Sequence, residues 1–276
     1  MDEVCLLAAT ERPDVVVFCE SWLNESIADD LIHVPGYQRP FRCDRKLRRG
    51  GGVCLFVKDH FPVRYLTGLP PPPPCIESVW LFLSTLKLII LALYVPPGLS
   101  ASQHYEISDY IVCGADEAFN NVADSNLIIL GDINNLPTSG LENSLSLRQV
   151  VQIPTRGASI LDKILIDENI CDFYCSPTTR PNFGRADHLA VMLQPVNRPS
   201  DPARLVKVFD FRASNIRKFQ NSLKLQRWHD LYKSTNDVNG KCNSFYRMLS
   251  NALRAIPFTF VELSTVQMIS RGSLQP

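Results

Sequence analysis

The chain has 276 residues, of which 45% are hydrophobic and 20% are charged, a balance that excludes a disordered chain and allows a sizeable core. Its net charge is zero, but residues 1–200 carry 16 basic and 23 acidic side chains, whereas residues 201–276 carry 12 and 5. Nine scattered cysteines without a CxxC pair disfavour a disulfide-rich secreted scaffold or a zinc site, and the most apolar region, 79–95, is too interrupted to span a bilayer.

Runs of apolar and β-branched residues predict a series of short strands. In chain order these are Asp14–Cys19, Gly51–Val57, Val79–Leu83, Leu88–Tyr94, Leu127–Leu130, Leu161–Ile166 and Leu189–Leu193. The third and fourth are expected to be antiparallel neighbours joined near Thr85. Ser102 is expected to cap a helix whose apolar residues recur at helical spacing up to Phe119. Because strands outnumber helices and the connections are mixed, the pattern favours an α+β sandwich of two sheets with outer helices.

The composition changes near residues 195–202, where proline and polar residues predict a boundary after a domain of residues 1–197. Beyond it, apolar residues share one helical face around Ile216–Leu223 and again around Phe245–Ile256, so residues 204–257 are expected to be a helical extension. Residues 258–276 lose this periodicity and are expected to be a disordered tail. The excess positive charge of residues 201–276 favours contact with nucleic acid, although a solvated tail explains it almost as well.

Two acidic features follow predicted strands in the first half of the domain. Glu20 comes directly after the strand that ends at Cys19, where a carboxylate is well placed to bind a hard cation such as Mg²⁺. Gly131 allows a sharp turn after the strand Leu127–Leu130, and alternation then points Asp132 and Asn134 the same way. An isolated glutamate is more often a surface residue or helix cap, and a Gly-Asp-Asn cluster is often a simple turn.

Two further features lie near the end of this domain. His188 is preceded by Asp187 and followed by a predicted strand, and an imidazole at this place could donate to a phosphoryl oxygen. Asp162 lies at the head of an apolar strand, where a buried carboxylate needs a partner; we expect a hydrogen bond to His188, with a salt bridge to Lys163 or an arginine as the alternative. Because each lies at the end of a predicted strand, a single cleft rim is expected to bring together Glu20, Asp132, Asn134, Asp187 and His188.

Taken in order, Glu20, Tyr94, the Gly131-Asp132-Ile133-Asn134 segment, Asp162 and Asp187-His188 resemble the endonuclease/exonuclease/phosphatase superfamily. The resemblance implies a four-layered α/β/β/α sandwich and metal-dependent cleavage of phosphoesters. It narrows to the endonuclease domains of non-LTR (LINE-type) retrotransposons through further segments. These are CESWL at 19–23, RRGGGVCLFV at 48–57, the YVPP turn at 94–97, QIPTR at 152–156 and the segment 209–257, which resembles a connector to a reverse transcriptase.

The resemblance implies roles for single residues. Glu20 would hold the Mg²⁺ or Mn²⁺ ion with Asp187 beside it, and Asp132 with Asn134 would orient or deprotonate the attacking water. His188, oriented by Asp162, and Tyr94 would bind the phosphate. The basic segment around residues 39–49 would meet the DNA backbone, although it also reads as a solvated loop. The residues expected to bind nucleic acid are Arg45, Arg48, Arg49 and Arg156.

Three departures from the family pattern shape the expectation for function. The chain starts in the helix that follows the family's first strand, so the domain is expected to be truncated and only weakly active in nicking target DNA. Val95 replaces an arginine and Ala186 replaces a serine. The expected partners are DNA and a reverse transcriptase that is absent from this sequence, with no membrane, and the expected location is intracellular and nuclear. A catalytically dead remnant that binds nucleic acid, and a phosphoesterase acting on lipids or small molecules, stay as alternatives.

Overall fold

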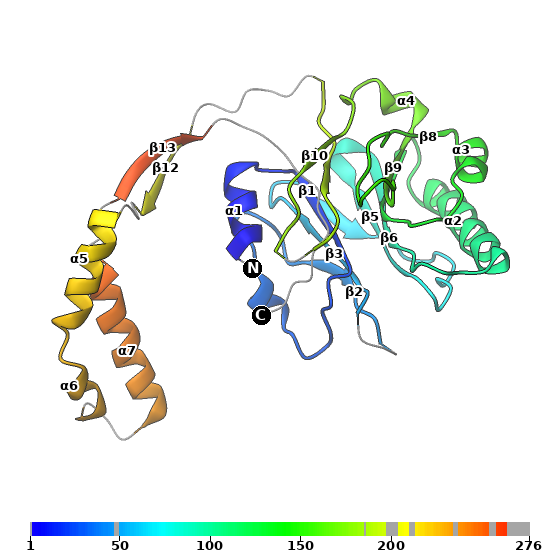
Figure 1. Cartoon of the computed structure of the whole chain (residues 1–276). Coiled ribbons are helices and arrows are strands. Elements are labelled where there is room, and N and C mark those ends of the chain that lie inside the picture. Colours follow the sequence, from blue (N-terminus) through cyan, green and yellow to red (C-terminus); the bar gives the residue numbers. More distant parts are fainter. Residues whose placement is uncertain are drawn as a thin grey trace. The chain divides into compact units, whose positions relative to one another are not determined.

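The computed structural model describes residues 2–46, 50–184, 186–196, 204–209, 213–233, 237–253 and 258–263. The chain divides into two compact units between residues 200 and 201 (Figure 1). The first unit contains the two larger sheets and every residue that the sequence singles out for chemistry. None of the described helices combines the length and the hydrophobicity that a membrane-spanning helix requires.

A six-stranded mixed sheet forms the centre of the first unit. Its strands, in spatial order, are β4 (Val63–Tyr65), β5 (Glu77–Leu83), β6 (Leu88–Tyr94), β7 (Asn126–Asp132), β9 (Asp162–Asp167) and β8 (Leu147–Gln149). Only β6 and β7 are parallel, because the long helix α2 (Ala101–Asn121) carries the chain back to the start of β7. The other neighbours are antiparallel.

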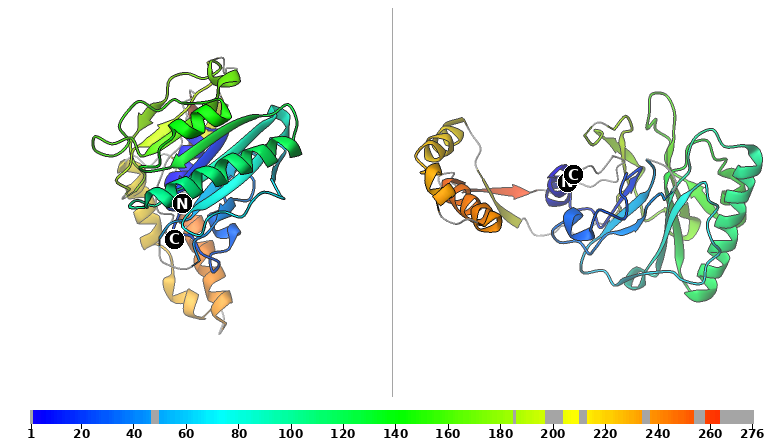
Figure 2. Two further views of the ribbon diagram at one scale, coloured as in Figure 1. Left: turned by 90° about the vertical axis from the view of Figure 1, so that its right-hand side faces the viewer. Right: turned by 90° about the horizontal axis from the view of Figure 1, so that it is seen from below.

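A smaller sheet faces the six-stranded one. It has the order β1 (Val15–Cys19), β3 (Val53–Val57), β2 (Phe41–Cys43), and the hairpin of β10 (Thr178–Arg180) and β11 (Ala190–Met192) shares the apolar cluster around it. Among the described residues, β1 forms a ladder with β3 alone. Helix α1 (Asp2–Thr10) covers the outer face of this small sheet, and α2 covers the outer face of the six-stranded sheet (Figure 2).

Three apolar layers hold these elements together. One lies between α2 and the six-stranded sheet, one between the two sheets, and one between α1 and the small sheet. Phe18 and Phe56 are fully buried in the last layer and meet edge to face, with ring centroids 6.1 Å apart. Burying a side chain of this size contributes roughly 1.5–3 kcal/mol. The predicted four-layered α/β/β/α sandwich is therefore confirmed.

Each predicted strand is present, with bounds that are the same for Leu88–Tyr94 and differ by one or two residues for the others. β5 and β6 are antiparallel as predicted and are joined by the short 3-10 turn η2 (Ser84–Leu86). The predicted helix cap lies two residues too late: the side chain of Ser100, not Ser102, accepts from the backbone N–H of Gln103 in a capping box. The sequence signal for this cap is the Ser-x-x-Gln spacing of a capping box, in which Gln103 lies four residues before the first apolar helix position, Ile107.

Several short elements of the first unit have no clear sequence signal. They are the three-residue strands β2, β4, β8 and β10, the 3-10 turn η1 (Asp29–Ile32), and the helices α3 (Ser139–Leu145) and α4 (Glu168–Cys171). Periodicity needs more residues than these elements contain, so it predicts only the longer ones.

The second unit corrects two predictions for the C-terminal part. Residues 204–209 form the strand β12, and residues 258–263, expected in a disordered tail, form β13, which pairs with it in antiparallel register. Alternating β-branched and aromatic residues, as in Phe258-Thr-Phe-Val, favour a strand once a partner is available. The rest of the expected tail, 264–276, lies outside the described residues.

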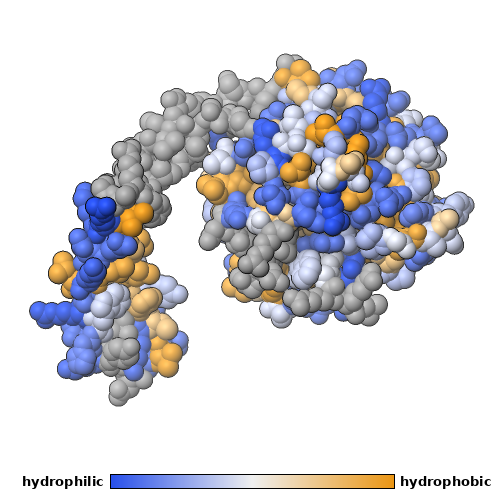
Figure 3. All heavy atoms as spheres, viewed as in Figure 1, coloured by the Kyte–Doolittle hydropathy of each residue, from blue (hydrophilic) through white to orange (hydrophobic). Residues whose placement is uncertain are grey.

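Three helices follow β12 in the second unit. They are α5 (Ala213–Lys224), α6 (Trp228–Lys233) and α7 (Val238–Leu253), and both α5 and α6 contact α7. The rings of Trp228 and Phe245 lie 6.0 Å apart. Other apolar side chains, including Leu225 and Val238, are exposed, and apolar surface is visible on these helices in Figure 3. A helical segment is thus present within residues 204–257, flanked by the two strands.

Candidate active site

Three polar residues lie in one row at an edge of the six-stranded sheet. Tyr94 ends β6 and Asp132 ends the parallel strand β7, so the carboxyl ends of both strands meet at the same edge. Asp162 begins the antiparallel strand β9, which brings its amino end to that edge as well. In the sheet register Tyr94 pairs with Asp132, and Asp132 pairs with Asp162. The three side chains are therefore neighbours although 68 residues of sequence separate the first from the last.

Glu20 reaches this row from the small sheet. It directly follows β1, and the hydroxyl of Tyr94 donates to its Oε1 at 2.5 Å. Glu20 has a φ of +52°, a left-handed backbone conformation that residues other than glycine adopt at a cost in conformational energy. Such strain persists only where the surroundings impose it, and it is common at functional sites.

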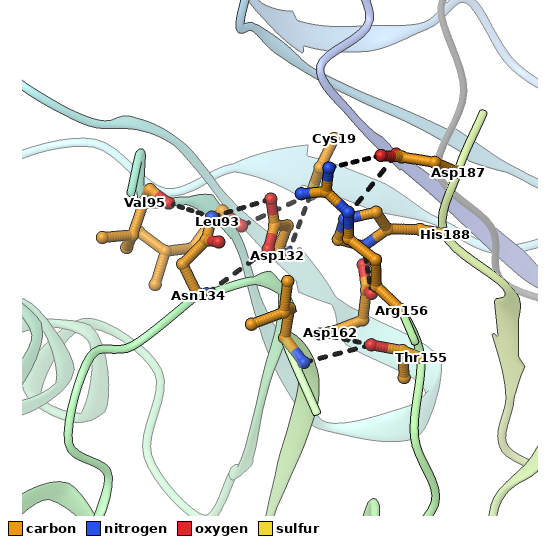
Figure 4. A network of polar contacts seen from close by, with 11 residues as sticks. Cys19, Leu93, Val95, Asp132, Asn134, Thr155, Arg156, Asp162, Asp187 and His188 are labelled. Carbon is orange, nitrogen blue, oxygen red and sulfur yellow. Dashed lines mark hydrogen bonds and ion pairs between the residues drawn. The ribbon is translucent and has the colours of Figure 1, made fainter. Parts of the chain in front are cut away.

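Cys19 joins the two sheets behind Glu20. Its Sγ lies 3.4 Å from the carbonyl oxygen of Leu93 and accepts from the backbone N–H of Asp132 at 3.2 Å (Figure 4). The strand that carries Glu20 is thereby tied to the strand that carries Asp132. Sequence alone suggests no more than a packing role for this cysteine, since a contact across 113 positions leaves no local signal.

The segment after β7 holds Asp132 in a buried position. Asp132 is fully buried and Asn134 is 5% exposed. The amide Nδ2 of Asn134 donates to the carbonyl of Val95 at 2.7 Å and to Asp132 Oδ2 at 3.0 Å, and its backbone N–H donates to Asp132 Oδ1 at 3.3 Å. A carboxylate that accepts such bonds is stabilised in its charged form. The positive charge of Lys163 also interacts with Asp132. Burial lowers the pKa of Lys163, and attraction to Asp132 partly offsets that decrease.

Gly131 makes this arrangement possible. Its φ is +144°, and a Cβ added there would lie 1.9 Å from the carbonyl oxygen of Leu93. We expect Gly131→Ala to lower the free energy of unfolding by about 3 kcal/mol, because the backbones of β6 and β7 would have to separate. Denaturant unfolding measures this loss. Gly140→Ala is the control, since it lies in helix α3 and a Cβ added there would have no atom within 4 Å; a loss below about 1 kcal/mol for Gly131→Ala would contradict the steric argument.

His188 lies on the other side of Asp132 and is fully buried. Its Nδ1 lies 2.6 Å from Asp162 Oδ2, so the predicted hydrogen bond is confirmed, and the alternative partner Lys163 instead donates to the carbonyl of Leu136. Because the carboxylate accepts, Nδ1 carries the proton and Nε2 is the ring nitrogen that can meet a ligand. The imidazole is thus oriented by an acid, as in many hydrolytic sites.

Thr155 positions both members of this pair. Its buried hydroxyl accepts from the backbone N–H groups of Leu161 and Asp162 at 3.1 and 3.2 Å, and its carbonyl accepts from Leu189 N–H at 2.7 Å. It therefore fixes the segments on which Asp162 and His188 lie. In the sequence this threonine stands out only as a member of the QIPTR segment.

Asp187 and Arg156 lie together at the surface of the site. Asp187 Oδ2 is 2.5 Å from the guanidinium of Arg156, with side-chain exposures of 63% and 51%. Asp187 Oδ1 is 3.9 Å from His188 Nε2. The half-exposed guanidinium of Arg156 can thus contact a ligand. Asp187 is paired with Arg156 and does not lie with the buried carboxylates of Asp132 and Asp162.

The arginines expected to bind nucleic acid separate into different groups. The structure corrects the prediction that Arg45 binds nucleic acid. Its side chain is only 10% exposed and forms a two-pronged ion pair with Glu77 at 2.6 and 2.8 Å. Arg48 and Arg49 lie outside the described residues. A charged loop in sequence does not reveal a buried partner 32 residues away, and the one local signal for such a partner is Glu77 at the start of an apolar strand.

Oxygen-rich donor groups fit a hard divalent cation here. Among the described residues, ligand atoms of Asp132, Asp162 and His188 lie within 4.8 Å of one another. Glu20 contributes another carboxylate next to Tyr94. Carboxylate oxygens are the ligands that Mg²⁺ and Mn²⁺ prefer. The structure therefore brings together Glu20, Tyr94, Asp132, Asn134, Asp162 and His188. Figure 4 shows the part of this site around Asp132, Asn134, Asp162 and His188, with Asp187 and Arg156 beside them.

Comparison with known proteins agrees with this arrangement. Residues 1–201 match the model of the endonuclease/exonuclease/phosphatase family. The 3'-5' exonuclease NExo from Neisseria meningitidis is similar in structure, with 14% identity and a TM-score of 0.53 over 70% of this chain and 93% of its own. The AP endonuclease LMAP from Leishmania major has 16% identity and a TM-score of 0.52 over 71% and 83%.

A third solved structure is the endonuclease domain of TRAS1, a telomere-specific non-LTR retrotransposon, with 16% identity and a TM-score of 0.49 over 70% of this chain and 90% of that domain. No curated protein sequence matches the chain. At these identities the likeness to the first two structures shows the fold alone.

Proposed function

We propose that this chain, which belongs to the endonuclease/exonuclease/phosphatase family, is a nuclease that hydrolyses phosphodiester bonds in DNA with a bound divalent cation. The observation that carries the proposal is the row of Tyr94, Asp132 and Asp162, with Glu20 at one end and His188 at the other. Carboxylates to hold a cation and activate water, beside an imidazole to meet the phosphate, are the groups that such hydrolysis requires.

The contacts suggest a role for each buried group. Asp132 is proposed to orient the attacking water and accept its proton, because Asn134 holds the carboxylate in one position through two hydrogen bonds. His188 is proposed to meet a phosphate oxygen through Nε2, since Nδ1 is held by the carboxylate of Asp162. Tyr94 is proposed to bond a phosphate oxygen in addition to Glu20.

Glu20 is proposed as the principal cation ligand, with Asp187 as a second group near the site. A bound Mg²⁺ ion would supply positive charge against the charge that develops on the phosphate, and Mn²⁺ would serve in its place. Glu20 suits the role because one of its oxygens is held by Tyr94, which fixes the direction of the other.

We further propose that the DNA is the insertion target of a non-LTR retrotransposon and that the partner is a reverse transcriptase of the same element. This rests on the segments CESWL, RRGGGVCLFV, YVPP and QIPTR and on the helical segment after residue 209. Such an enzyme would act on chromosomal DNA, so a nuclear location is part of the proposal.

A plasmid-nicking assay tests the proposed function. Supercoiled DNA should become open circular in the presence of Mg²⁺ or Mn²⁺, EDTA should stop the reaction, and Glu20→Gln, which keeps the size of the side chain, should reduce it strongly. Nicking that persists in EDTA, or that is unchanged in Glu20→Gln, would overturn the proposal. Release of phosphate from inositol or lipid phosphates without nicking of DNA would point to the phosphoesterase alternative.

Arg156 is expected to contribute to affinity for the DNA backbone. Arg156→Gln should weaken DNA binding uniformly across sequences and reduce the slope of log K against log salt by about 1, because one phosphate contact is lost. Fluorescence anisotropy over a salt series measures both quantities. Arg64→Gln is the control, since this exposed arginine lies on β4 against the ring of Phe82; equal slopes for Arg156→Gln and the unaltered chain would exclude the contact.

A further inference from the structure

Arg45 and Glu77 form a buried ion pair directly behind the proposed cation site. Arg45 Nε lies 2.6 Å from Glu77 Oε1, and its second donor lies 2.8 Å from Oε2, with side-chain exposures of 10% and 7%. A two-pronged pair of this kind fixes the plane of the guanidinium as well as its position. Removing two charges from water costs free energy, which the attraction between them offsets only in good geometry. A buried ion pair at this place is therefore a candidate for a positioning role.

The guanidinium of Arg45 lies against Tyr94. Its central carbon is 5.3 Å from the centroid of the tyrosine ring, a cation–π distance. The hydroxyl of the same tyrosine donates to Glu20. An uninterrupted series of contacts thus runs from Glu77 through Arg45 and Tyr94 to Glu20.

The glycine run before β3 fits around this pair. A Cβ at Gly51 would lie 2.3 Å from the central guanidinium carbon of Arg45, so a side chain there would displace the arginine. The backbone N–H of Gly52 donates to Glu77 Oε2 at 3.2 Å. The carbonyls of Gly52 and Gly51 accept from the N–H groups of Ser21 and Trp22 at 3.2 and 3.0 Å, which pins the backbone just after Glu20. One loop therefore holds both the ion pair and the strained residue Glu20.

The electrostatics agree with this coupling. Burial acts to lower the pKa of Arg45, but the hydrogen bond and charge of Glu77, together with attraction to Tyr94 and Glu20, outweigh it and raise the pKa. The arginine therefore stays charged at every working pH, and its field reaches Glu20.

We propose that Arg45 and Glu77 are positioning residues, which hold Tyr94 and through it the Glu20 carboxylate, and so set the affinity of the site for its divalent cation. The inference rests on the proposed role of Glu20 as a cation ligand. Partners that orient a metal ligand from behind typically change metal affinity by about 10- to 100-fold when they are removed. The glycine run and the ion pair are then parts of one support for a single carboxylate.

Binding of Mn²⁺ to the full chain, followed by electron paramagnetic resonance of the free ion, tests the inference without relying on activity. Removing only one charge would leave the other buried and unpaired, so the test variant is the double substitution Arg45→Met with Glu77→Leu, which tolerates burial better. It should bind Mn²⁺ about 10- to 100-fold more weakly while unfolding cooperatively. If this variant fails to fold, Arg45→Lys keeps the charge, loses the two-pronged geometry, and should show a weakening in the same direction.

The pair Lys58 and Asp14 is a matched control. Lys58 Nζ lies 2.7 Å from Asp14 Oδ1, and Asp14 immediately precedes β1, at the opposite end of that strand from Glu20. Lys58→Met with Asp14→Leu should leave Mn²⁺ affinity unchanged. If the unaltered chain does not bind Mn²⁺, the proposed function fails; if it binds but the Arg45/Glu77 variants bind equally well, the positioning inference fails.

The route through Tyr94 has its own test. Tyr94→Phe removes the hydroxyl that bonds Glu20, so adding the Arg45/Glu77 substitutions to Tyr94→Phe should weaken Mn²⁺ binding little further. If the two losses of Mn²⁺ affinity instead multiply in the combined variant, the ion pair acts by a route other than Tyr94, and the inference is overturned.

Discussion

Asp132→Asn should lower the rate of DNA nicking by a factor on the order of 10²–10⁴, which is the usual contribution of a positioned acid or base. The side chain is fully buried and held by Asn134, so asparagine keeps its size but cannot accept the proton of a water molecule. The lost negative charge also weakens attraction for a cation. Single-turnover nicking at saturating Mg²⁺ measures the rate separately from DNA binding.

Asp167→Asn provides the control for this substitution. Asp167 is also buried, at 6% exposure, but it ends β9 at the edge of the sheet away from the site and accepts from the N–H of Asn169. The control should nick at close to the normal rate, since asparagine can make the same capping bond. If Asp132→Asn remained within tenfold of the unaltered chain while both folded, Asp132 would not be the base.

The convergence of the site could be predicted because strand ends carry the signal. An apolar run followed by Gly131-Asp132 marks the end of a strand, and strands of one sheet that are parallel end at one edge. Asp162 at the head of an antiparallel strand falls at the same edge for the same reason. Local pattern plus one rule of sheet geometry is therefore enough to place these residues together without the register.

The surroundings of Glu20 could not be predicted in the same way. A run of basic residues resembles an exposed loop and so predicts a DNA contact for Arg45, and nothing local shows that Glu77 neutralises it 32 residues later. The contacts of Cys19 with Leu93 and Asp132 likewise join two sheets and depend on how the layers stack. Side-chain pairing between sheets is a property of tertiary packing, on which periodicity is silent.

The C-terminal hairpin shows a related limit. The helical period ends before Phe258–Leu263, which predicts a disordered tail, yet the segment alternates as a strand does and pairs with Arg204–Phe209. A strand has no stability of its own, so a lone alternating segment predicts a strand only if a partner is recognised. The partner here lies some 50 residues earlier in the sequence, beyond the intervening helices.

His188→Ala should also reduce nicking by a factor on the order of 10²–10⁴, because the buried imidazole is the group proposed to meet developing charge on the phosphate. Asp162→Asn should cost less, about 10- to 100-fold, since it keeps the histidine but removes the carboxylate that holds its ring and its proton. An asparagine amide could also donate to Nδ1 and favour the wrong tautomer. Single-turnover rates of the two single variants and of the double variant measure the coupling.

The double variant decides how Asp162 acts. If the carboxylate works only through His188, the double variant should be no slower than His188→Ala alone, because there is no ring left to orient. Asp162 is also one of three residues whose ligand atoms lie within 4.8 Å of one another, so a direct contact with a cation is the competing role. In that case the two losses would multiply, and Asp162→Asn would raise the Mg²⁺ concentration needed for half-maximal rate whether or not His188 is present. Coupled losses with an unchanged Mg²⁺ requirement would assign Asp162 to the histidine, and multiplied losses with a raised requirement would assign it to the cation.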